Sequence, residues 1–355
     1  MRLRRRWPWL LAAALLLSLA AWLLWTPDTL APTSRPQLEL PRHLRPAERQ
    51  RMQARLTPVP TFDAGPAAMG VPRQDPMLTA LSAGGGSSAV VLEVNALRYS
   101  PLGELLLGCL VAREGRESAL ESLRKAGIDP LQDVDRVGIT EHGLVVSGDF
   151  RKTQWATLLG DATPQTYGDK GSITAVEPRA EGGSTLYATR WGDSLLYLGT
   201  SADDARSVVD ALENRGPRSP PILQPDQTYG EMYGVVSGSD LAQALGETGG
   251  WGKALAGAAS SVELHLDARR DVGLVAEVSG DDAAKVADLG KTLGGALAVG
   301  RVQARAGGDA ETAELLDFAR VVPGREGKLS LELALPLEVV AKRLAFCRNP
   351  PDAGR

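Results

Sequence analysis

His142 is the residue of this 355-residue chain that most resembles a catalytic group, because carboxylates surround it in the sequence. It follows Glu141 in the stretch VDRVGITEHGLVVSGDF, which also contains Asp135 and Asp149. A histidine beside carboxylates can transfer protons or bind a metal ion. However, β-branched residues flank TEHG on both sides, and a Glu-His-Gly turn between strands is usually solvated. We therefore interpret the stretch as a β-hairpin with His142 at its turn.

His265 belongs to a second hairpin pattern, SVELHLDARRDVGLVAEVSGDD. If the apolar residues of SVELHLDA face a core, the two-residue alternation of a strand turns His265 outward with Glu263 and Asp267. The third histidine, His43, lies in a Pro-rich segment, and no spacing resembles a zinc site. We therefore predict no metal site and no bound cofactor, and we expect His142 and His265 to be dispensable.

Three short motifs suggest nucleotide, acyl-enzyme or calcium chemistry, but none completes its pattern. DLGKTLGG (288–295) lacks the first glycine of a phosphate loop, since that position is Lys285. Ser122 and Lys125 have the S-x-x-K spacing of serine acyl enzymes, but neither S-D-N nor K-T-G follows. DPLQDVD (129–135) lacks the spacing of a calcium loop. The sequence thus offers no assignable catalytic, cofactor-binding or metal-binding residue, and an enzyme is the less favoured interpretation.

Two acidic doublets have a structural explanation. Asp203-Asp204 and Asp281-Asp282 each begin a predicted helix. Carboxylates at that position accept hydrogen bonds from free backbone N–H groups and interact favourably with the helix dipole. We therefore expect both doublets to cap helices rather than to bind a ligand.

The chain contains two cysteines, Cys109 and Cys347. An exported protein can join such a pair in a disulfide bond. Cys109 lies in the apolar stretch LGELLLGCLV, where a buried free thiol is equally natural. The sequence leaves both states open, and we expect neither cysteine to be needed for function.

The first 25 residues have the pattern of a signal anchor. Four arginines in MRLRRR precede the uncharged stretch 7–25, which has Trp at both ends. Nineteen helical residues span about 29 Å, close to the hydrocarbon thickness of a bilayer. Positive residues remain cytoplasmic, and the apolar stretch lacks the small-residue cleavage site of a signal peptide. We predict an uncleaved inner-membrane helix over 7–25, with the rest of the chain exported.

The charge balance of the exported part argues against nucleic acid as a partner. Residues 81–355 contain 28 basic and 38 acidic residues, although the whole chain has a net charge of only −4. Proteins that bind nucleic acid electrostatically concentrate basic residues instead. The excess of acidic residues therefore predicts a protein that binds neither nucleic acid nor an anionic lipid surface.

Residues 26–88 contain ten of the 23 prolines and end in SAGGGSS, a composition that predicts a flexible tether. Within it, PAERQRMQARL (46–56) has the pattern of a short helix beginning at proline. Two α+β units follow, at 89–216 and 229–347, joined by a linker at 217–228 and followed by a flexible tail at 348–355.

Both units have a similar order of predicted elements, β-α-α-β-β-α-β and β-α-β-β-α-β. This order is that of a ferredoxin-like, or split βαβ, unit, in which helices cover one face of an antiparallel sheet. It suggests a tandem duplication. The expected core residues of the two hairpins are Val137, Ile139, Leu144, Val146, Val262, Leu264, Leu266, Leu274 and Ala276.

These features predict a single-pass protein of the bacterial inner membrane with its bulk in the periplasm. Small anchored α+β units favour a non-catalytic interaction or scaffold function, with another envelope protein as the partner. The alternative is an exported hydrolase or a small-ligand-binding protein with a site in the cleft between the two units.

Overall fold

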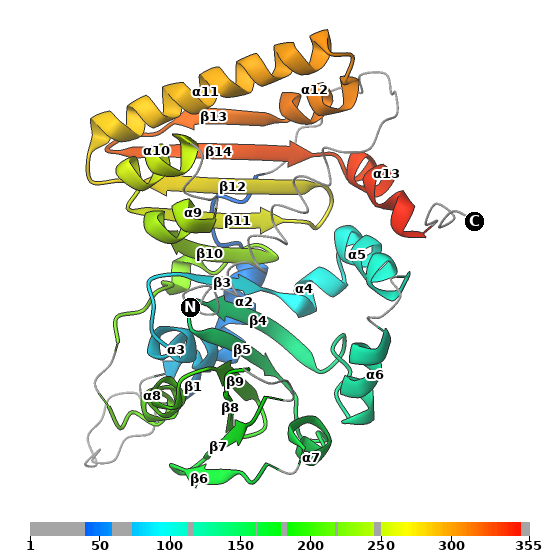
Figure 1. Cartoon of the computed structure of the whole chain (residues 1–355), viewed down its shortest axis with the longest axis vertical. Helices are drawn as coiled ribbons and strands as arrows, with labels where there is room; N and C mark the ends of the chain where they lie inside the picture. The colour runs from blue at the N-terminus through cyan, green and yellow to red at the C-terminus, as the bar shows by residue number, and fades with distance from the viewer. Residues whose placement is uncertain are drawn as a thin grey trace. The chain divides into compact units, whose positions relative to one another are not determined.

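The computed structural model describes residues 40–58, 73–112, 117–160, 162–178, 183–216, 219–244 and 250–348 (Figure 1). They form two compact units. The first comprises the described residues of Leu44–Asn95 and Glu114–Thr228, and the second those of Trp9–His43, Ala96–Arg113 and Tyr229–Arg355.

The first unit is built on seven antiparallel strands in the spatial order β3-β4-β5-β9-β8-β7-β6. They are β3 (Ala89–Leu92), β4 (Val134–Thr140), β5 (Gly143–Gly148), β6 (Gln165–Tyr167), β7 (Gly171–Val176), β8 (Leu186–Trp191) and β9 (Leu195–Gly199). A separate pair joins β1 (Thr57–Pro58) to β2 (Arg73–Gln74). The helices of the first unit are α2 (Pro46–Arg55), α3 (Pro76–Ala83), α6 (Glu117–Lys125), α7 (Trp155–Leu159), α8 (Ala202–Leu212) and the 3-10 turn η2 (Pro225–Gln227). Helix α4 (Val94–Arg98) has residues in both units.

Helix α3 is the main departure from the expected flexible tether at 26–88. Met77, Ala80 and Leu81 are buried, and the helix contacts β4, β5 and α8. The helix comes close to the sheet because β4 has Gly138 there: a Cβ at that position would lie 2.7 Å from Met77 Cε. The Pro-rich composition predicts an unfolded segment. The burial of a few apolar residues on one side of a short helix is enough to join this segment to the core.

Helix α2 forms where the sequence predicts one, with Pro46 in its first turn. Arg45 before the helix and Arg55 at its end make contacts with carboxylates of the first unit. The Glu48 carboxylate accepts a hydrogen bond from the Arg45 backbone N–H, and Arg55 lies within 3.0 Å of carboxylate oxygens of Glu93 and Asp135. Burial by itself would lower the pKa of Arg55. The hydrogen bond to Glu93 and the negative charges of Glu93 and Asp135 outweigh that effect, so the pKa of Arg55 is raised. Part of the segment that the sequence predicts to be a flexible tether is therefore folded.

Helices cover both faces of the first sheet, not one. On β4, the buried residues Arg136, Gly138 and Thr140 share one face, and α3 packs on this face. The predicted core residues Val137 and Val146 lie on the other face, where they pack around Ile128 and Phe150. The alternating pattern of β4 agrees with the prediction. The sequence predicts helices on only one face of the sheet, because α3, which covers the other face, lies in the segment predicted to be a tether.

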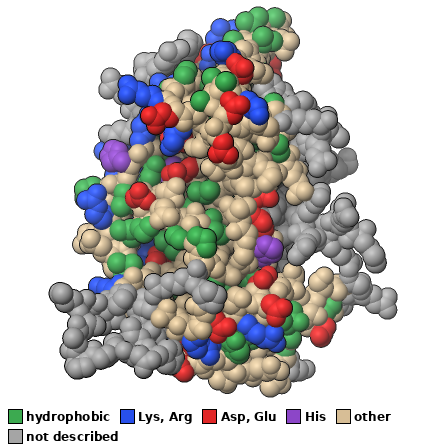
Figure 2. Space-filling view, turned by 90° about the vertical axis from the view of Figure 1, so that its left-hand side faces the viewer, with side chains coloured by type: hydrophobic (Ala, Val, Ile, Leu, Met, Phe, Trp, Pro, Cys, Tyr) green, Lys and Arg blue, Asp and Glu red, His purple; other side chains and the backbone are tan. Residues whose placement is uncertain are grey.

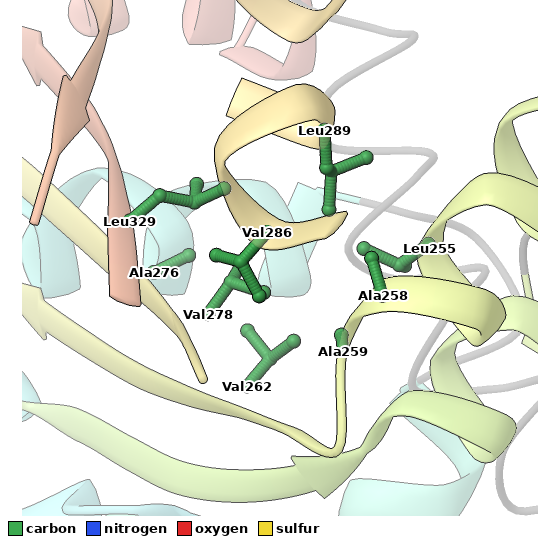
Figure 3. Packing of buried hydrophobic residues seen from close by; sticks show 9 residues of the cluster. All are labelled: Leu255, Ala258, Ala259, Val262, Ala276, Val278, Val286, Leu289 and Leu329. Carbon is green, nitrogen blue, oxygen red and sulfur yellow. The ribbon is translucent and has the colours of Figure 1, made fainter. Parts of the chain in front are cut away.

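The second unit has five antiparallel strands in the order β13-β14-β12-β11-β10. They are β10 (Met232–Ser237), β11 (Ser261–Asp267), β12 (Val272–Ser279), β13 (Ala319–Pro323) and β14 (Lys328–Leu335). Its helices are α5 (Pro101–Ala112), α9 (Gly238–Ala244), α10 (Gly250–Ala258), α11 (Ala283–Ala306), α12 (Ala310–Asp317) and α13 (Leu337–Arg348). Figure 3 shows the apolar cluster in which side chains of α10 and α11 meet those of β11, β12 and β14.

Helix α5 belongs to the second unit, although the sequence places it inside the segment 89–216. It packs against α13, and Leu102 of α5 joins a cluster with Leu335 and Leu344. The linker also differs from the expectation. Leu223 is buried, and Ile222 donates its backbone N–H to Ser82 Oγ within the first unit.

The two units share a strand order that is not that of a split βαβ unit. In each, the first strand pairs with the second and the second with the third: β3-β4-β5 and β10-β11-β12. The third then pairs with the strand before the last helix, β9 or β14. In a ferredoxin-like unit the first strand would lie beside the third. A short turn fixes a hairpin, but partners across helices are fixed by packing that the order of elements does not reveal.

The predicted membrane helix at 7–25 and the tail beyond residue 348 lie outside the described residues. Within the described ranges, no helix combines the length and the apolar character that crossing a membrane requires.

Candidate functional site

The β4–β5 turn brings His142 close to two carboxylates, one of which the sequence did not indicate. His142 Nε2 lies 3.8 Å from Glu141 Oε2, and Nδ1 lies 3.9 Å from Asp204 Oδ2 in the first turn of α8. The carboxylates thus flank opposite ring nitrogens and do not converge on one point. This arrangement explains why the cluster is not among the groups able to hold a metal ion, of which the described residues contain none.

Asp135 and Asp149 do not join His142. Asp135 lies 3.0 Å from Arg55, and the exposed Asp149 pairs with Arg151. Hydrogen bonds from the Arg151 side chain and backbone lower the pKa of Asp149 to about 2. Both carboxylates therefore pair with arginines and lie outside the His142 cluster.

Glu141 has a structural task at the same turn. Its Oε1 accepts hydrogen bonds from the backbone N–H of Ser87, at 2.8 Å, and from the Ser87 hydroxyl, at 3.1 Å. The glycines before Ser87 allow this approach, because Gly85 and Gly86 have φ values of +82° and +101°. Beneath the turn, burial raises the pKa of Tyr197, so its phenol stays protonated. The turn is therefore a packed corner rather than a proton-transfer site.

His265 is buried, which corrects the expectation that it faces outward. Its ring stacks on Tyr229 with centroids 3.6 Å apart. Nδ1 lies 3.2 Å from the Tyr229 carbonyl oxygen, and Nε2 lies 2.7 Å from Glu263 Oε1. The strand alternation was right, but the face opposite the helices is covered by the Tyr229 segment. His265 thus holds that segment and has no open side toward a substrate.

The remaining motif residues have structural positions. Asp282 caps α11 by accepting hydrogen bonds from two backbone N–H groups, as the sequence predicts, and Ser201 rather than an aspartate caps α8. Residues 288–295 lie inside α11. Ser122 is exposed on α6, and Lys125 pairs with Glu121 at 2.8 Å.

An apolar cavity of about 170 Å³ lies within the first unit. Its floor consists of residues that point to one face of three adjacent strands, and its wall comes from α7 and from the segment leading to β6. The lining residues are Trp155, Ala156, Leu159, Ala162, Pro164, Ser172, Thr174, Ala188, Arg190 and Leu196. Helix α8 packs on the opposite face, since Val209 lies against Gly171, the neighbour of Ser172.

Arg190 supplies the one formal charge among the described lining residues of this cavity. Its guanidinium carbon lies 5.5 Å from the centre of the Trp155 ring, within the range of a cation–π contact. In the part of the chain that the structure describes, no carboxylate oxygen comes within 4.0 Å of it. The register places Arg190 between Ser172 on β7 and Leu196 on β9. The cavity therefore combines apolar walls with a cation that has no carboxylate partner among the residues that the structure describes.

The cavity is not predictable from the sequence because its lining residues come from five segments. The sequence does predict the elements that carry two of the lining residues. STLYATRWGDS has the pattern of a strand that contains Arg190, and RKTQWATLLG has the pattern of a short helix that contains Trp155. Nothing in the sequence indicates that Trp155 and Arg190 meet, since the contact depends on which strands pair.

Comparison with known proteins adds little. No protein-family model matches the chain, and no curated protein matches it. Among solved structures, the chain is similar to crystal form I of TP0453, with 12% sequence identity and a TM-score of 0.40 over 75% of this chain and 96% of that chain. A likeness of this size is too small to indicate a shared function.

Proposed function

We propose that this protein is a non-catalytic binding protein of the bacterial envelope. Residues 7–25 hold it in the inner membrane, both units lie in the periplasm, and the first unit binds another envelope protein. The observation that carries the proposal is the apolar cavity beside α7, with Arg190 at its floor and no described carboxylate within 4.0 Å of Arg190.

The cavity is suited to binding rather than to reaction. Its polar groups are the hydroxyls of Ser172 and Thr174 and the guanidinium of Arg190. A serine or threonine nucleophile needs an adjacent base, and neither His, Lys, Asp nor Glu is among the lining residues. Elsewhere, His265 and the carboxylates near the β4–β5 turn have structural partners. These observations support a ligand that is held without covalent chemistry.

An exported location is supported by Cys109, which is disulfide-bonded. The chain has one other cysteine, Cys347, and α5 packs against α13. Disulfide bonds persist in the periplasm and are rare in the cytosol. This supports the direction of insertion that the N-terminal arginines predict.

The described surface supports a protein partner rather than a nucleic acid. On the face shown in Figure 2, Lys and Arg side chains lie among Asp and Glu side chains and do not gather into one basic patch. Nucleic-acid binding needs such a patch to release counterions. A small-ligand-binding protein is the second candidate, and the same cavity favours it, although this site lies inside the first unit.

Photo-crosslinking in living cells tests the proposal. Ala156 and Thr157 are both exposed on α7, but only Ala156 lines the cavity. A photoreactive amino acid at position 156 is expected to give an adduct of defined mass, and the same amino acid at 157 is expected to give none. Leu159→Trp fills the cavity with a larger side chain, so combining it with the photoreactive residue at 156 should abolish the adduct. Equal adducts at 156 and 157, or an adduct that survives this block, would contradict the proposal.

A further inference from the structure

We infer that the cavity binds a short apolar group that carries a carboxylate, as at the C-terminus of a protein that ends in a large apolar residue. This inference rests on the proposed function, since it names the chemistry of the ligand at the same site. Three observations support it: Arg190 has no carboxylate partner among the described residues, the cavity is small, and its polar and apolar side chains lie at different ends.

Arg190 differs from the buried arginines of the chain. Arg136 pairs with Asp75 at 2.7 Å, and Arg343 pairs with Glu311 at 2.9 Å. Arg190 is half-buried and lies beside the Trp155 ring, but it has no carboxylate partner in the described ranges. Removing a cation partly from water is unfavourable unless an anion or another partner offsets the loss of hydration. An anionic ligand would supply that partner.

The geometry of the guanidinium suits a carboxylate. A planar guanidinium presents parallel N–H groups that match the two oxygens of a carboxylate. The guanidinium carbon lies 5.5 Å from the centre of the Trp155 ring, and no described carboxylate occupies the N–H groups. Ser172, directly opposite Arg190 across the β7–β8 pair, offers a hydroxyl to the same group.

The apolar part of the ligand has a separate place. Leu196 lies opposite Arg190 on the other side, across the β8–β9 pair, and Ala188 and Leu159 complete an apolar end. The cavity thus has a polar end at Ser172 and an apolar end at Leu196, with Arg190 between them. Cross-strand neighbours of this kind are about 5 Å apart, so both ends are within reach of one small group.

The volume limits the size of that group. Sites for drug-sized ligands are about 300–1,000 Å³, whereas this cavity measures about 170 Å³. It therefore accommodates one large side chain or a chain of a few carbons, but not a complete phospholipid. A C-terminal residue provides the apolar side chain and the carboxylate on neighbouring atoms, and a medium-chain fatty acid has the same chemistry.

Calorimetry on the full-length chain in nanodiscs tests the inference, with empty nanodiscs as the blank. The probes are a tetrapeptide that ends in phenylalanine, the same peptide with an amidated C-terminus, and octanoate. We expect the free-acid peptide to bind at least tenfold more tightly than the amide. Octanoate binding more tightly than the peptide would support the same chemistry and assign a fatty acid as its source.

Arg190→Gln should remove the preference for the free acid, and Arg190→Lys should retain part of it because the charge remains. Arg206→Gln removes the charge of an exposed side chain on α8, outside the cavity, and should leave the preference unchanged. Thermal unfolding of each variant checks that it is folded. Equal binding of acid and amide, an unchanged preference in a folded Arg190→Gln protein, or no binding of any probe would overturn the ligand class.

The two proposals fail in different ways. If position 156 still forms its specific adduct while acid and amide bind equally, the cavity binds its partner through apolar contacts and only the carboxylate is wrong. If positions 156 and 157 do not differ, the proposed function itself fails.

Discussion

Arg136 and Asp75 form a buried ion pair with two hydrogen bonds, from Nη1 to Oδ2 at 2.7 Å and from Nη2 to Oδ1 at 2.9 Å. Asp75 also accepts a hydrogen bond from the Met77 backbone N–H at the start of α3. One carboxylate therefore caps a helix and joins it to strand β4. It holds a segment that composition alone describes as a tether.

Asp75→Ala should destabilise the first unit by about 3–5 kcal/mol, because it removes the carboxylate that makes both short hydrogen bonds with the buried Arg136 guanidinium. Urea unfolding measures the effect. The exposed pair of Arg206 and Asp203 provides the control, since Asp203→Ala should change stability by less than about 1 kcal/mol. Equal effects of the two substitutions would show that α3 does not depend on this pair.

Local structure was predictable from the sequence to the extent that it depends on near neighbours. The hairpins at 134–150 and 261–279, the helix after Pro46 and the cap at Asp282 all follow from alternation, turn residues and helix-start signals. Their burial was less predictable. Which face of a strand is covered depends on segments far along the chain, such as α3.

The candidate site shows the same limit more strongly. His142 and Glu141 are sequence neighbours, but Asp204 reaches them from α8. Trp155 and Arg190 meet because β7, β8 and β9 pair in order and α7 packs on that face. Strand pairing over such separations is set by the whole core. The sequence motifs therefore point to residues with structural roles and do not indicate the cavity.

The two histidines should respond differently to substitution. His265→Ala removes a buried ring, its stack on Tyr229 and the hydrogen bond to Glu263, so we expect a loss of about 2–4 kcal/mol. The His142 side chain is 30% exposed, and both its carboxylate neighbours lie beyond hydrogen-bond distance. His142→Ala should cost less than about 1 kcal/mol. Thermal unfolding of the two variants side by side measures the difference, and the reverse order would refute this assignment.

The disulfide bond of Cys109 should contribute to stability without taking part in binding. Closing a long loop restricts the unfolded chain, and losing such a bond typically costs about 2–5 kcal/mol. Cys109→Ser and Cys347→Ser should give the same loss, and both should match the reduced wild-type protein in denaturant unfolding. Photo-crosslinking at position 156 should be unchanged in both variants. Rapid labelling of two thiols in the native, unreduced protein would show that the bond is absent.

The predicted topology places the N-terminus in the cytoplasm and residues 26–355 in the periplasm. It rests on the four arginines before the uncharged stretch 7–25 and on the absence of a small-residue cleavage site after it. Protease added to spheroplasts should remove the bulk of the chain, while the same protease should leave a cytoplasmic marker intact. N-terminal sequencing of the membrane-bound protein should then find the original N-terminus. A mature N-terminus between Ala20 and Ala31 would show instead that the apolar stretch is a cleaved signal peptide, and the protein would reach its partner without an anchor.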